Sequence, residues 1–416
     1  MNIAFVTTCL FGRPGNGGEM CSARLMNGLL RAGHRLHAIG RGAVPAPGAA
    51  PDGVSFHSVG AGVSSFDLLS QLQRVSSLLG AWRAGQASTV HRLNDGLVPQ
   101  QVVARLNAQP MAAFDAIVVD HLQAYAWVAA AQTTLPPMLL MMHNLESEGY
   151  TERAAQAAAA GRSLRAAVFH REARLLRSLE GLALRHAAAV ACLSEGDAQA
   201  LRTLAAATGS RPPVHVLPGF PSHDDGVADG RPSTGPLPTP GGRRRIGLLG
   251  TWTWGPNREG LDWMLDQVLP HLPKDSELVL AGQGLTARAP SLRVRVLGRV
   301  DSVQQFYDQV DVVAVPSWTG SGVHEKAIEA VARARVVVAT PHALRGLGDS
   351  LPAHVHVAEQ AADFAHLCAQ AGPGPNAAAA TARWAAQRHA LYEAGLQQCL
   401  DALADTARCD DSRRAA

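Results

Sequence analysis

The chain is poor in aromatic residues, in charged residues and above all in lysine. Aromatic residues make up 5% and charged residues 17% of its 416 residues, whereas hydrophobic residues make up 47%. Its only lysines are Lys274 and Lys326, and arginine supplies the other positive charges. The net charge of +3 is too small to favour a nucleic-acid partner. A lysine retained in such a sequence is a candidate for a specific role.

Paired cysteines and long apolar runs are also lacking. No two of the six cysteines form a CxxC pair, which argues against a disulfide framework or a zinc site. No run approaches the ~20 apolar residues that span a bilayer, and the opening segment MNIAFVTTCLF lacks the positive region of a signal peptide. We therefore expect a cytoplasmic protein that meets a membrane, if at all, from the inner surface as a peripheral protein.

Short runs of Val, Leu and Ile alternate with helical stretches along the chain. This repetition predicts parallel sheets wrapped by helices, which is an α/β fold. A segment rich in Pro, Gly and Asp interrupts it and is typical of a linker. We predict an N-terminal domain over 1–220, the linker over 221–244, a C-terminal domain over 245–375 and a helical segment over 376–416. This last helix is long enough to pack back on the first domain.

The predicted strands divide between the two domains. Those of the first domain are residues 3–7, 35–39, 116–119, 138–142, 189–193 and 214–217. Those of the second domain are residues 246–249, 278–280, 294–297, 312–315 and 336–339. Ligands of open α/β sheets bind where the carboxyl ends of the strands meet, so candidate residues are sought at these ends.

A glycine cluster, GNGG, follows the first predicted strand and includes Gly17 and Gly18. Glycines let the backbone approach an anion closely, and the helix after them offers unpaired N–H groups. The spacing does not match GxGxxG, and the second strand runs into Arg41 instead of a carboxylate. A nicotinamide dinucleotide is therefore disfavoured. A tight turn that simply needs glycine explains the cluster equally well.

Two histidines follow predicted strands of the first domain. His143 comes directly after the apolar run MLLMM, and His121 follows the strand that ends near Asp120. A histidine at a strand end is well placed to face a cleft, although a lone histidine is more often structural. His121 is the weaker candidate.

The segment VPSWTGSGVHEKAIEA gives the strongest local signal. A strand ends near Pro316, a glycine-containing loop follows, and a helix is predicted to begin near Val323. On that helix Lys326 and Glu329 share a face. Backbone N–H groups at the start of the helix, together with a lysine one turn into it, can bind a diphosphate. A carboxylate three positions after the lysine can accept hydrogen bonds from a ribose. A surface Glu–Lys pair is the alternative explanation.

Eight segments together resemble the retaining glycosyltransferases of glycosyltransferase family 4. They are GNGG, RAGHRLHAIGRG, MMHNLES, HAAAVACLSEGDAQAL, GLLGTWTWGPNREGLDWML, LVLAGQG, VLGRV and DVVAVPSWTGSGVHEKAIEAVA. Their order and spacing carry the resemblance over nearly the whole chain. It implies the GT-B fold, two Rossmann-like domains that face a central cleft, and transfer of a sugar from a nucleotide-diphosphate donor.

In the second domain, the resemblance implies that Glu329 binds the donor ribose and that Lys326 neutralises its diphosphate. Gly322 and Val323 would offer backbone N–H groups to the phosphates. A backbone stretch at residues 299–300, Arg299 and Val300, would hold the nucleobase.

In the first domain, Gly17 and Gly18 match a loop that closes over the diphosphate and sugar. His143 matches a histidine that contacts the transferred sugar.

The sequence departs from the family pattern at two places. The first glutamate of the family's pair falls on Ser321, so its contact to the donor sugar is lost or Glu325 provides it in another geometry. The usual Arg and Lys after the first strand of the second domain are also missing, and Arg258 is the candidate substitute. A related subgroup with a PN-type loop shows the same departures, which favours variation over loss of activity.

The resemblance implies transfer with retention and without a metal or cofactor, from a UDP- or GDP-linked sugar. No acidic DxD-like pair sits at a strand end, which agrees with metal independence. The acceptor stays open among a saccharide such as a growing polysaccharide, a lipid-linked saccharide and a small molecule. Six arginines between residues 153 and 177 indicate either a face for anionic lipid or phosphate, or a solvated helix face.

Three other functions remain open. An inactive nucleotide-sugar-binding subunit of a polysaccharide assembly system is the main alternative. A sugar-nucleotide epimerase of the same fold, which needs no acceptor, comes second, and a dinucleotide oxidoreductase third.

Overall fold

The protein is described here by a computed structural model. It describes residues 1–11, 16–46, 51–62, 79–94, 97–108, 114–130, 135–221, 243–285, 292–300, 302–320, 322–334, 336–374 and 376–415. Ser321 and residues 222–242 of the predicted linker lie outside the described residues.

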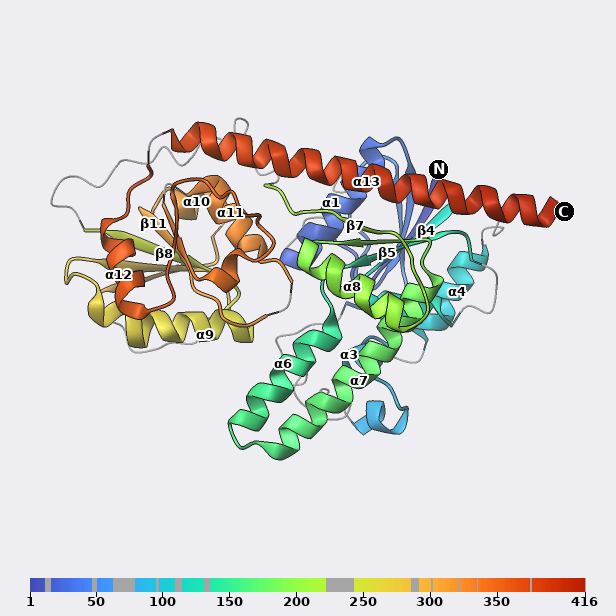
Figure 1. The fold of residues 1–416 in the computed structure, drawn as a ribbon, viewed down its shortest axis with the longest axis horizontal. Coiled ribbons are helices and arrows are strands. Elements are labelled where there is room, and N and C mark those ends of the chain that lie inside the picture. Colours follow the sequence, from blue (N-terminus) through green and yellow to red (C-terminus); the bar gives the residue numbers. More distant parts are fainter. Residues whose placement is uncertain are drawn as a thin grey trace. The chain divides into compact units, whose positions relative to one another are not determined.

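The chain divides into two compact units. The first consists of Met1–Leu217 and Glu393–Ala416, and the second of Pro218–Tyr392. Most of the predicted linker is not described, so the domain limits given above stay a prediction. Each unit has its own sheet (Figure 1).

The first unit contains a seven-stranded parallel sheet in the order β3-β2-β1-β4-β5-β6-β7. Its strands are β1 (Asn2–Thr7), β2 (Arg35–Gly40), β3 (Val54–Ser58), β4 (Ala116–Asp120), β5 (Met138–Met142), β6 (Ala189–Cys192) and β7 (Val214–Val216). Every strand predicted for this domain is present. The sequence order reverses between β1 and β4, and such a switch point is where open α/β sheets place their ligands.

Helices cover the first sheet. They are α1 (Gly17–Arg31), α3 (Ser88–Leu93), α4 (Val98–Ala108), α5 (Leu122–Val128), α6 (Glu146–Ala159), α7 (Ser163–His186) and α8 (Glu195–Ala207). Apolar residues of β1, β4, β5 and β6 pack with α5, α7 and α8 into one large core cluster. Helices α6 and α7 form an antiparallel pair that projects from the sheet (Figure 1).

The second unit contains a six-stranded parallel sheet in the order β10-β9-β8-β11-β12-β13. Its strands are β8 (Arg245–Leu249), β9 (Glu277–Ala281), β10 (Val294–Gly298), β11 (Val312–Val315), β12 (Val337–Ala339) and β13 (Val355–Val357). Its α-helices are α9 (Gly255–Trp263), α10 (Val303–Tyr307), α11 (Glu325–Arg333) and α12 (Ala361–Gln370). Two apolar clusters pack on this sheet.

The sequence prediction missed two strands, β3 and β13. Both lie at the edge of their sheet, and their residues are half-buried or exposed. An edge strand in contact with solvent does not need the continuous apolar run that marks a buried parallel strand. The missing signal therefore follows from their position.

The last helix, α13 (Ala377–Ala415), contributes to both units. Its part from Glu393 onward belongs to the first unit, where Leu396, Cys399 and Leu403 are buried. The carbonyl of Val216 lies so close to Gly395 that a Cβ there would stand 2.4 Å from its oxygen. The prediction that this helix packs back on the first domain is confirmed.

The fold is thus α/β with two Rossmann-like units, as predicted. Among the described helices, none combines the length and the apolar character that crossing a membrane requires.

Candidate functional site

The loop between β11 and α11 carries the strongest sequence signal. Gly320 and Gly322 adopt positive φ angles of 109° and 85°, which keep this segment out of a helical conformation. The helix begins at Glu325, with His324 extended at φ −85° and ψ 100° before it. The prediction of a start near Val323 was therefore wrong by two residues. Gly322 and Val323 lie in the loop that precedes the helix.

Lys326 lies in the first turn of α11 and is half-buried. Its Nζ donates a hydrogen bond to Asn257 Oδ1 at 2.7 Å, and Asn257 Nδ2 donates to the carbonyl of Thr251 at 3.0 Å. Burial lowers the pKa of Lys326 to about 8. Within the described parts of the chain, Lys326 has no ion-pair partner. A lysine at the positive end of a helix is electrostatically unfavourable unless an anion binds there.

Glu325 and Glu329 are both buried on the same helix. Glu329 Oε2 accepts a hydrogen bond from Arg333 Nε at 2.5 Å, one turn further along. Arg333 is only 3% exposed. In this structure Glu329 therefore neutralises a buried cation, and its predicted role at a ribose stays a prediction. Glu325 occupies the first position of the helix, and its predicted contact with the donor sugar also stays a prediction.

The other predicted donor residues lie on two segments of the second unit. Arg258 lies on α9, next to Asn257, and its Nε donates to the carbonyl of Trp252 at 3.3 Å. Arg299 follows β10 and is exposed. Val300 packs against the core cluster of this unit. The hydrogen bond between Lys326 and Asn257 thus links α9 with α11. The predicted role of Arg299 at the nucleobase stays a prediction.

Sequence reasoning did not single out Asn257 or His324. In the sequence, Asn257 is indicated only as the Asn of a PN-type loop. Its hydrogen bond to Lys326 results from the packing of α9 and α11. His324 is buried, which lowers its pKa to about 3 and keeps the ring neutral. The neighbouring carbonyl of Gly320 accepts hydrogen bonds from His342 Nε2 at 3.1 Å and from an Arg345 guanidinium nitrogen at 3.2 Å.

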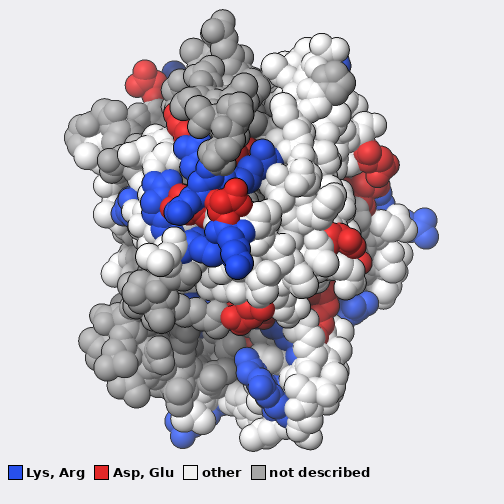
Figure 2. Space-filling model, turned by 90° about the vertical axis from the view of Figure 1, so that its left-hand side faces the viewer, with Lys and Arg blue, Asp and Glu red and all other residues white. Residues whose placement is uncertain are grey.

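Arginine side chains gather on the surface as well. On the face shown in Figure 2, Lys and Arg side chains surround several Asp and Glu side chains. Pairs of this kind occur in the second unit, where Glu277 lies near Arg243 and Arg295, and Arg245 near Asp311. Acidic and basic side chains are therefore interspersed on this face.

In the first unit, the sheet register places two polar residues side by side at the switch point. Thr7, the last residue of β1, pairs with Asp120, the last residue of β4. Asp120 is fully buried. Its Oδ2 accepts hydrogen bonds from Thr7 Oγ1 at 2.8 Å and from Ser22 Oγ of α1 at 2.6 Å. The sequence signal for Asp120, an acidic residue closing an apolar strand, was overlooked.

Both histidines of the first unit contact this carboxylate. His143 Nε2 lies 2.7 Å from Asp120 Oδ1, and His121 Nδ1 lies 3.2 Å from Asp120 Oδ2. The two imidazole rings stack with centroids 3.7 Å apart and an angle of 16° between their planes. Interaction with the two imidazoles holds the pKa of Asp120 well below its usual value although burial opposes this.

Asp120, His121 and His143 offer one metal-ligand atom each within 4.8 Å of one another. An imidazole lone pair lies in the plane of its ring. In stacked rings these planes are nearly parallel, so the two lone pairs do not converge on one ion about 2 Å from each nitrogen. The arrangement fits a shared hydrogen-bonded carboxylate better than a metal centre.

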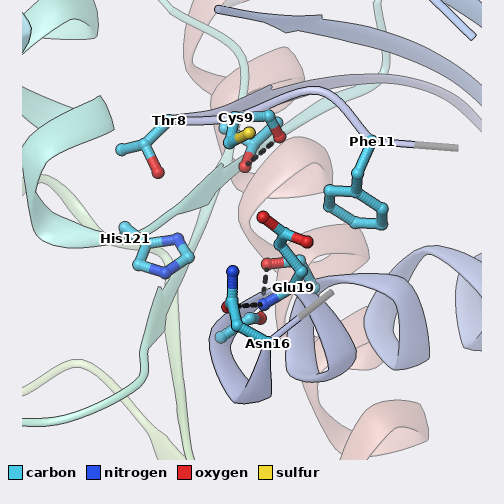
Figure 3. Close-up of a pocket in the computed structure, with 9 residues that line it drawn as sticks. Thr8, Cys9, Phe11, Asn16, Glu19 and His121 are labelled. Atoms are coloured by element: carbon cyan, nitrogen blue, oxygen red, sulfur yellow. Dashed lines mark hydrogen bonds between the residues drawn. The ribbon is translucent and has the colours of Figure 1, made fainter. Parts of the chain in front are cut away.

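A cavity of about 140 Å³ opens beside this cluster (Figure 3). It is lined by Thr7, Thr8, Cys9, Phe11, Asn16, Gly18, Glu19, Ser22 and His121. Asn16 caps α1, since its side chain accepts from the backbone N–H of Glu19 at 3.0 Å. Gly17 and Gly18 are the first residues of that helix. The structure therefore brings the glycine cluster and the two histidines together.

The arginines between residues 153 and 177 lie on the α6–α7 pair. Three of them stack on aromatic rings of the same unit: Arg153 on Tyr150, Arg165 on Phe169 and Arg171 on Trp82. These contacts are intramolecular, and contact with lipid or phosphate stays a prediction.

Comparisons with known proteins agree with this architecture. Residues 243–371 match the family model described as "Glycosyl transferases group 1". No curated protein sequence matches the chain.

Solved glycosyltransferase structures share the fold over its whole length. Anabaena HepE in complex with UDP-glucose is 16% identical, with a TM-score of 0.53 over 98% of this chain and 100% of that one. Sucrose-phosphate synthase from Thermosynechococcus elongatus is 15% identical, with a TM-score of 0.54 over 100% and 99%. TarM is 9% identical, with a TM-score of 0.61 over 97% and 98%. The chain thus has the GT-B fold.

Proposed function

We propose that the protein is a glycosyltransferase that transfers a sugar from a UDP- or GDP-linked donor. The observation that carries the proposal is Lys326, a half-buried cation at the start of α11 without an ion-pair partner in the described structure. The family match of residues 243–371 and the UDP-glucose bound by HepE support it.

Lys326 has a defined chemical task in this proposal. Breaking the anomeric C–O bond leaves negative charge on the departing diphosphate. A positive group fixed in advance at that position stabilises the charge without reorganisation. Asn257 holds the ammonium in place, and the N-terminus of α11 adds its positive dipole end. Gly322 and Val323 would add backbone N–H groups.

The finer assignments follow the same reasoning and are part of the proposal. Glu329 is placed at the donor ribose, and Arg258 beside the diphosphate. His143, held by Asp120, contacts the transferred sugar in the first unit. The reaction retains the anomeric configuration, is of the family 4 type and uses no metal or other cofactor. The diphosphate oxygen takes the acceptor proton as the acceptor attacks.

The acceptor is a saccharide, a lipid-linked saccharide or a small molecule, bound mainly by the first unit. The α6–α7 pair contacts the inner face of a membrane peripherally in this proposal, which is compatible with each of these three acceptors. Polysaccharide biosynthesis is the process we infer.

A thermal-shift screen of nucleotides tests the donor site. We expect UDP or GDP, and the matching nucleotide sugar, to raise the melting temperature of the wild type. At ligand concentrations of ~100 Kd the stabilisation is about 2.7 kcal/mol, which corresponds to several degrees. Lys326→Ala should abolish the shift.

Lys274→Ala is the matched control because it changes the only other lysine, which is exposed. It should keep the full shift. If no nucleotide stabilises the wild type, or if Lys326→Ala responds as the wild type does, the proposed site is wrong. Product analysis with and without acceptors then separates a transferase from an epimerase and from a binding subunit.

A further inference from the structure

Asp120 is the centre of a hydrogen-bonded cluster that spans several elements. Thr7 of β1 and Ser22 of α1 donate to it, and the imidazoles of His143 and His121 face its two oxygens. A buried carboxylate is costly unless such donors surround it. The cluster thus fixes both rings against one anion at the switch point of the sheet.

The backbone of His121 is held in an unusual conformation. Its φ is 78° and its ψ is 144°, a combination that residues other than glycine rarely adopt. Strained residues of this kind persist where surrounding contacts enforce them, and they concentrate at functional sites. Here the contact with Asp120 and the stacking on His143 enforce the conformation.

The orientation of His121 is specific. Because Nδ1 faces Asp120, Nε2 points the other way. A Cβ built on Gly18 would lie 3.6 Å from that Nε2, so this nitrogen faces the first turn of α1. Figure 3 shows the ring at the border of the cavity, with Asn16 and Glu19 across from it.

Several charged groups determine the protonation of this ring. Asp120 lies against Nδ1, Glu146 of α6 acts at longer range, and Glu19 of α1 borders the same cavity. His143 stacks on it and shares the carboxylate. Burial alone would lower the pKa of His121, but Asp120 and Glu146 outweigh it and raise the pKa above the ordinary histidine value.

We propose that His121 contacts the substrate and that Asp120 is its positioning residue, holding Nδ1 so that Nε2 donates a hydrogen bond to a phosphoryl oxygen in the cavity. The adjacent N-terminus of α1 favours an anion at the same place. The phosphoryl group belongs to the nucleotide donor or to a phosphorylated acceptor, an assignment that rests on the proposed function.

NMR of ¹⁵N-histidine-labelled full-length protein tests this without any turnover. His121→Gln identifies the His121 signals by their loss. Inorganic phosphate should shift the Nε2 resonance of His121, and the response should weaken as pH rises through the titration midpoint of this residue. That midpoint should lie above the ordinary histidine value. An Nε2 resonance that does not move at saturating phosphate overturns the proposal.

Asp120→Asn tests the positioning role because it removes the charge at nearly constant shape. It should lower the His121 midpoint, because Asp120 raises it, and abolish the phosphate response. Asp115→Asn is the matched control, since it makes the same change at an exposed aspartate of this unit that is part of neither the cluster nor the cavity lining. It should keep the response. An unchanged midpoint and response in Asp120→Asn contradict the positioning role.

Additional experiments separate this inference from the proposed function. A shift with UDP assigns the phosphoryl group to the donor, whereas a shift with glucose 6-phosphate but not UDP assigns it to the acceptor. In a transfer assay, His121→Gln should lower kcat/KM by on the order of 10²-fold. If the wild type transfers sugar but the His121 resonance does not respond to phosphate, the inference is wrong and the proposed function stands. If His121 responds to phosphate but the protein consumes no nucleotide sugar, the proposed function is wrong.

Discussion

Lys326 combines a cost in stability with a role in binding. The folded protein partly buries its ammonium group, with one neutral hydrogen-bond partner, Asn257. The unfolded chain exposes the same group to water, where its pKa has the ordinary value of 10.5, against about 8 in the folded state. This difference of about 2.5 units is worth about 3 kcal/mol at neutral pH. A site retained at such a cost is expected to bind something.

The first residue-scale prediction concerns Lys326→Met. Methionine fills a similar volume without the charge, so we expect the variant to unfold at higher denaturant concentration at pH 7. The gain should be about 2 kcal/mol, because the lost hydrogen bond to Asn257 offsets about 1 kcal/mol. Nucleotide binding should be lost in the same variant. Equilibrium unfolding by urea measures the difference.

The pH dependence of that gain follows from the pKa shift. Below pH 8 both states of the wild type hold the proton, and the full cost is present. Between pH 8 and pH 10.5 the folded state releases the proton while the unfolded state keeps it, so wild-type stability rises. The advantage of Lys326→Met should therefore shrink over this range. An advantage equal at pH 7 and pH 10, or one also given by Lys274→Met, would show that burial of the charge is not the cause.

Sequence reasoning found some site residues and missed others for a physical reason. Lys326 and His143 were predicted, because one stands out by composition and the other follows a strongly apolar strand. Asp120 and Asn257 were missed. Each acts through a partner far along the chain, 23 residues away for His143 and 69 for Lys326. Such pairs are created by packing and leave little local pattern.

At the scale of elements, close backbone approaches position the loops of the second unit. Gly282, in the segment LVLAGQG after β9, has a φ of 114°. A Cβ at this position would stand 1.8 Å from the carbonyl oxygen of Gly250, which follows β8. The two loops therefore touch backbone to backbone. The loop after Gly250 leads into α9, which carries Asn257.

We predict that Gly282→Ala strongly destabilises the second unit. No side chain can move to relieve the contact, because both atoms belong to the backbone, and the positive φ adds strain. The loss should be about 3 kcal/mol or more. Thermal unfolding followed by circular dichroism measures it. Nucleotide binding should weaken as well, since the loop that leads to Asn257 must shift.

Gly255→Ala is the control for this prediction. Gly255 begins α9, and a Cβ there would meet no atom within 4 Å. Its melting temperature should stay close to the wild-type value, and alanine can even favour the helix. Equal effects of the two substitutions would contradict the backbone-contact explanation.

At the scale of the whole molecule, α13 makes the first unit depend on the end of the chain. Its residues from Glu393 belong to the first unit, whose sheet is built from residues near the beginning. Leu396, Cys399, Leu400 and Leu403 are all buried there. Arg31 Nη2 lies 3.0 Å from Glu393 Oε1, but this ion pair is exposed and contributes little. The apolar contacts are the main stabilising part.

We predict that a chain ending at Tyr392 loses the cooperative unfolding of the first unit. Four buried side chains at about 1.5–3 kcal/mol each amount to about 6 kcal/mol or more. This is comparable to the total stability of a typical domain, about 5–15 kcal/mol. The second unit keeps Trp384 and Arg388 and should unfold as before. Differential scanning calorimetry resolves the two transitions.

A chain ending at Arg408 is the matched control. It retains all four buried residues and removes only the last eight residues of the sequence. Its transitions should match those of the full chain. If the first unit unfolds normally in the chain that ends at Tyr392, α13 is dispensable for its stability.

The sequence by itself determined the two α/β units and their buried strands, and the length of the last helix allowed its return to the first domain. The strands depend on apolar runs, which each segment carries locally because a parallel strand is covered on both faces. Only the tertiary structure decided the edge strands β3 and β13, the start of α11 at Glu325 and the partners of the site residues. Asp120 receives contacts from Thr7 and His143 because the parallel register aligns strand ends that are distant in the chain. Hydrogen bonds of that range depend on which strands are neighbours, and no local pattern encodes this.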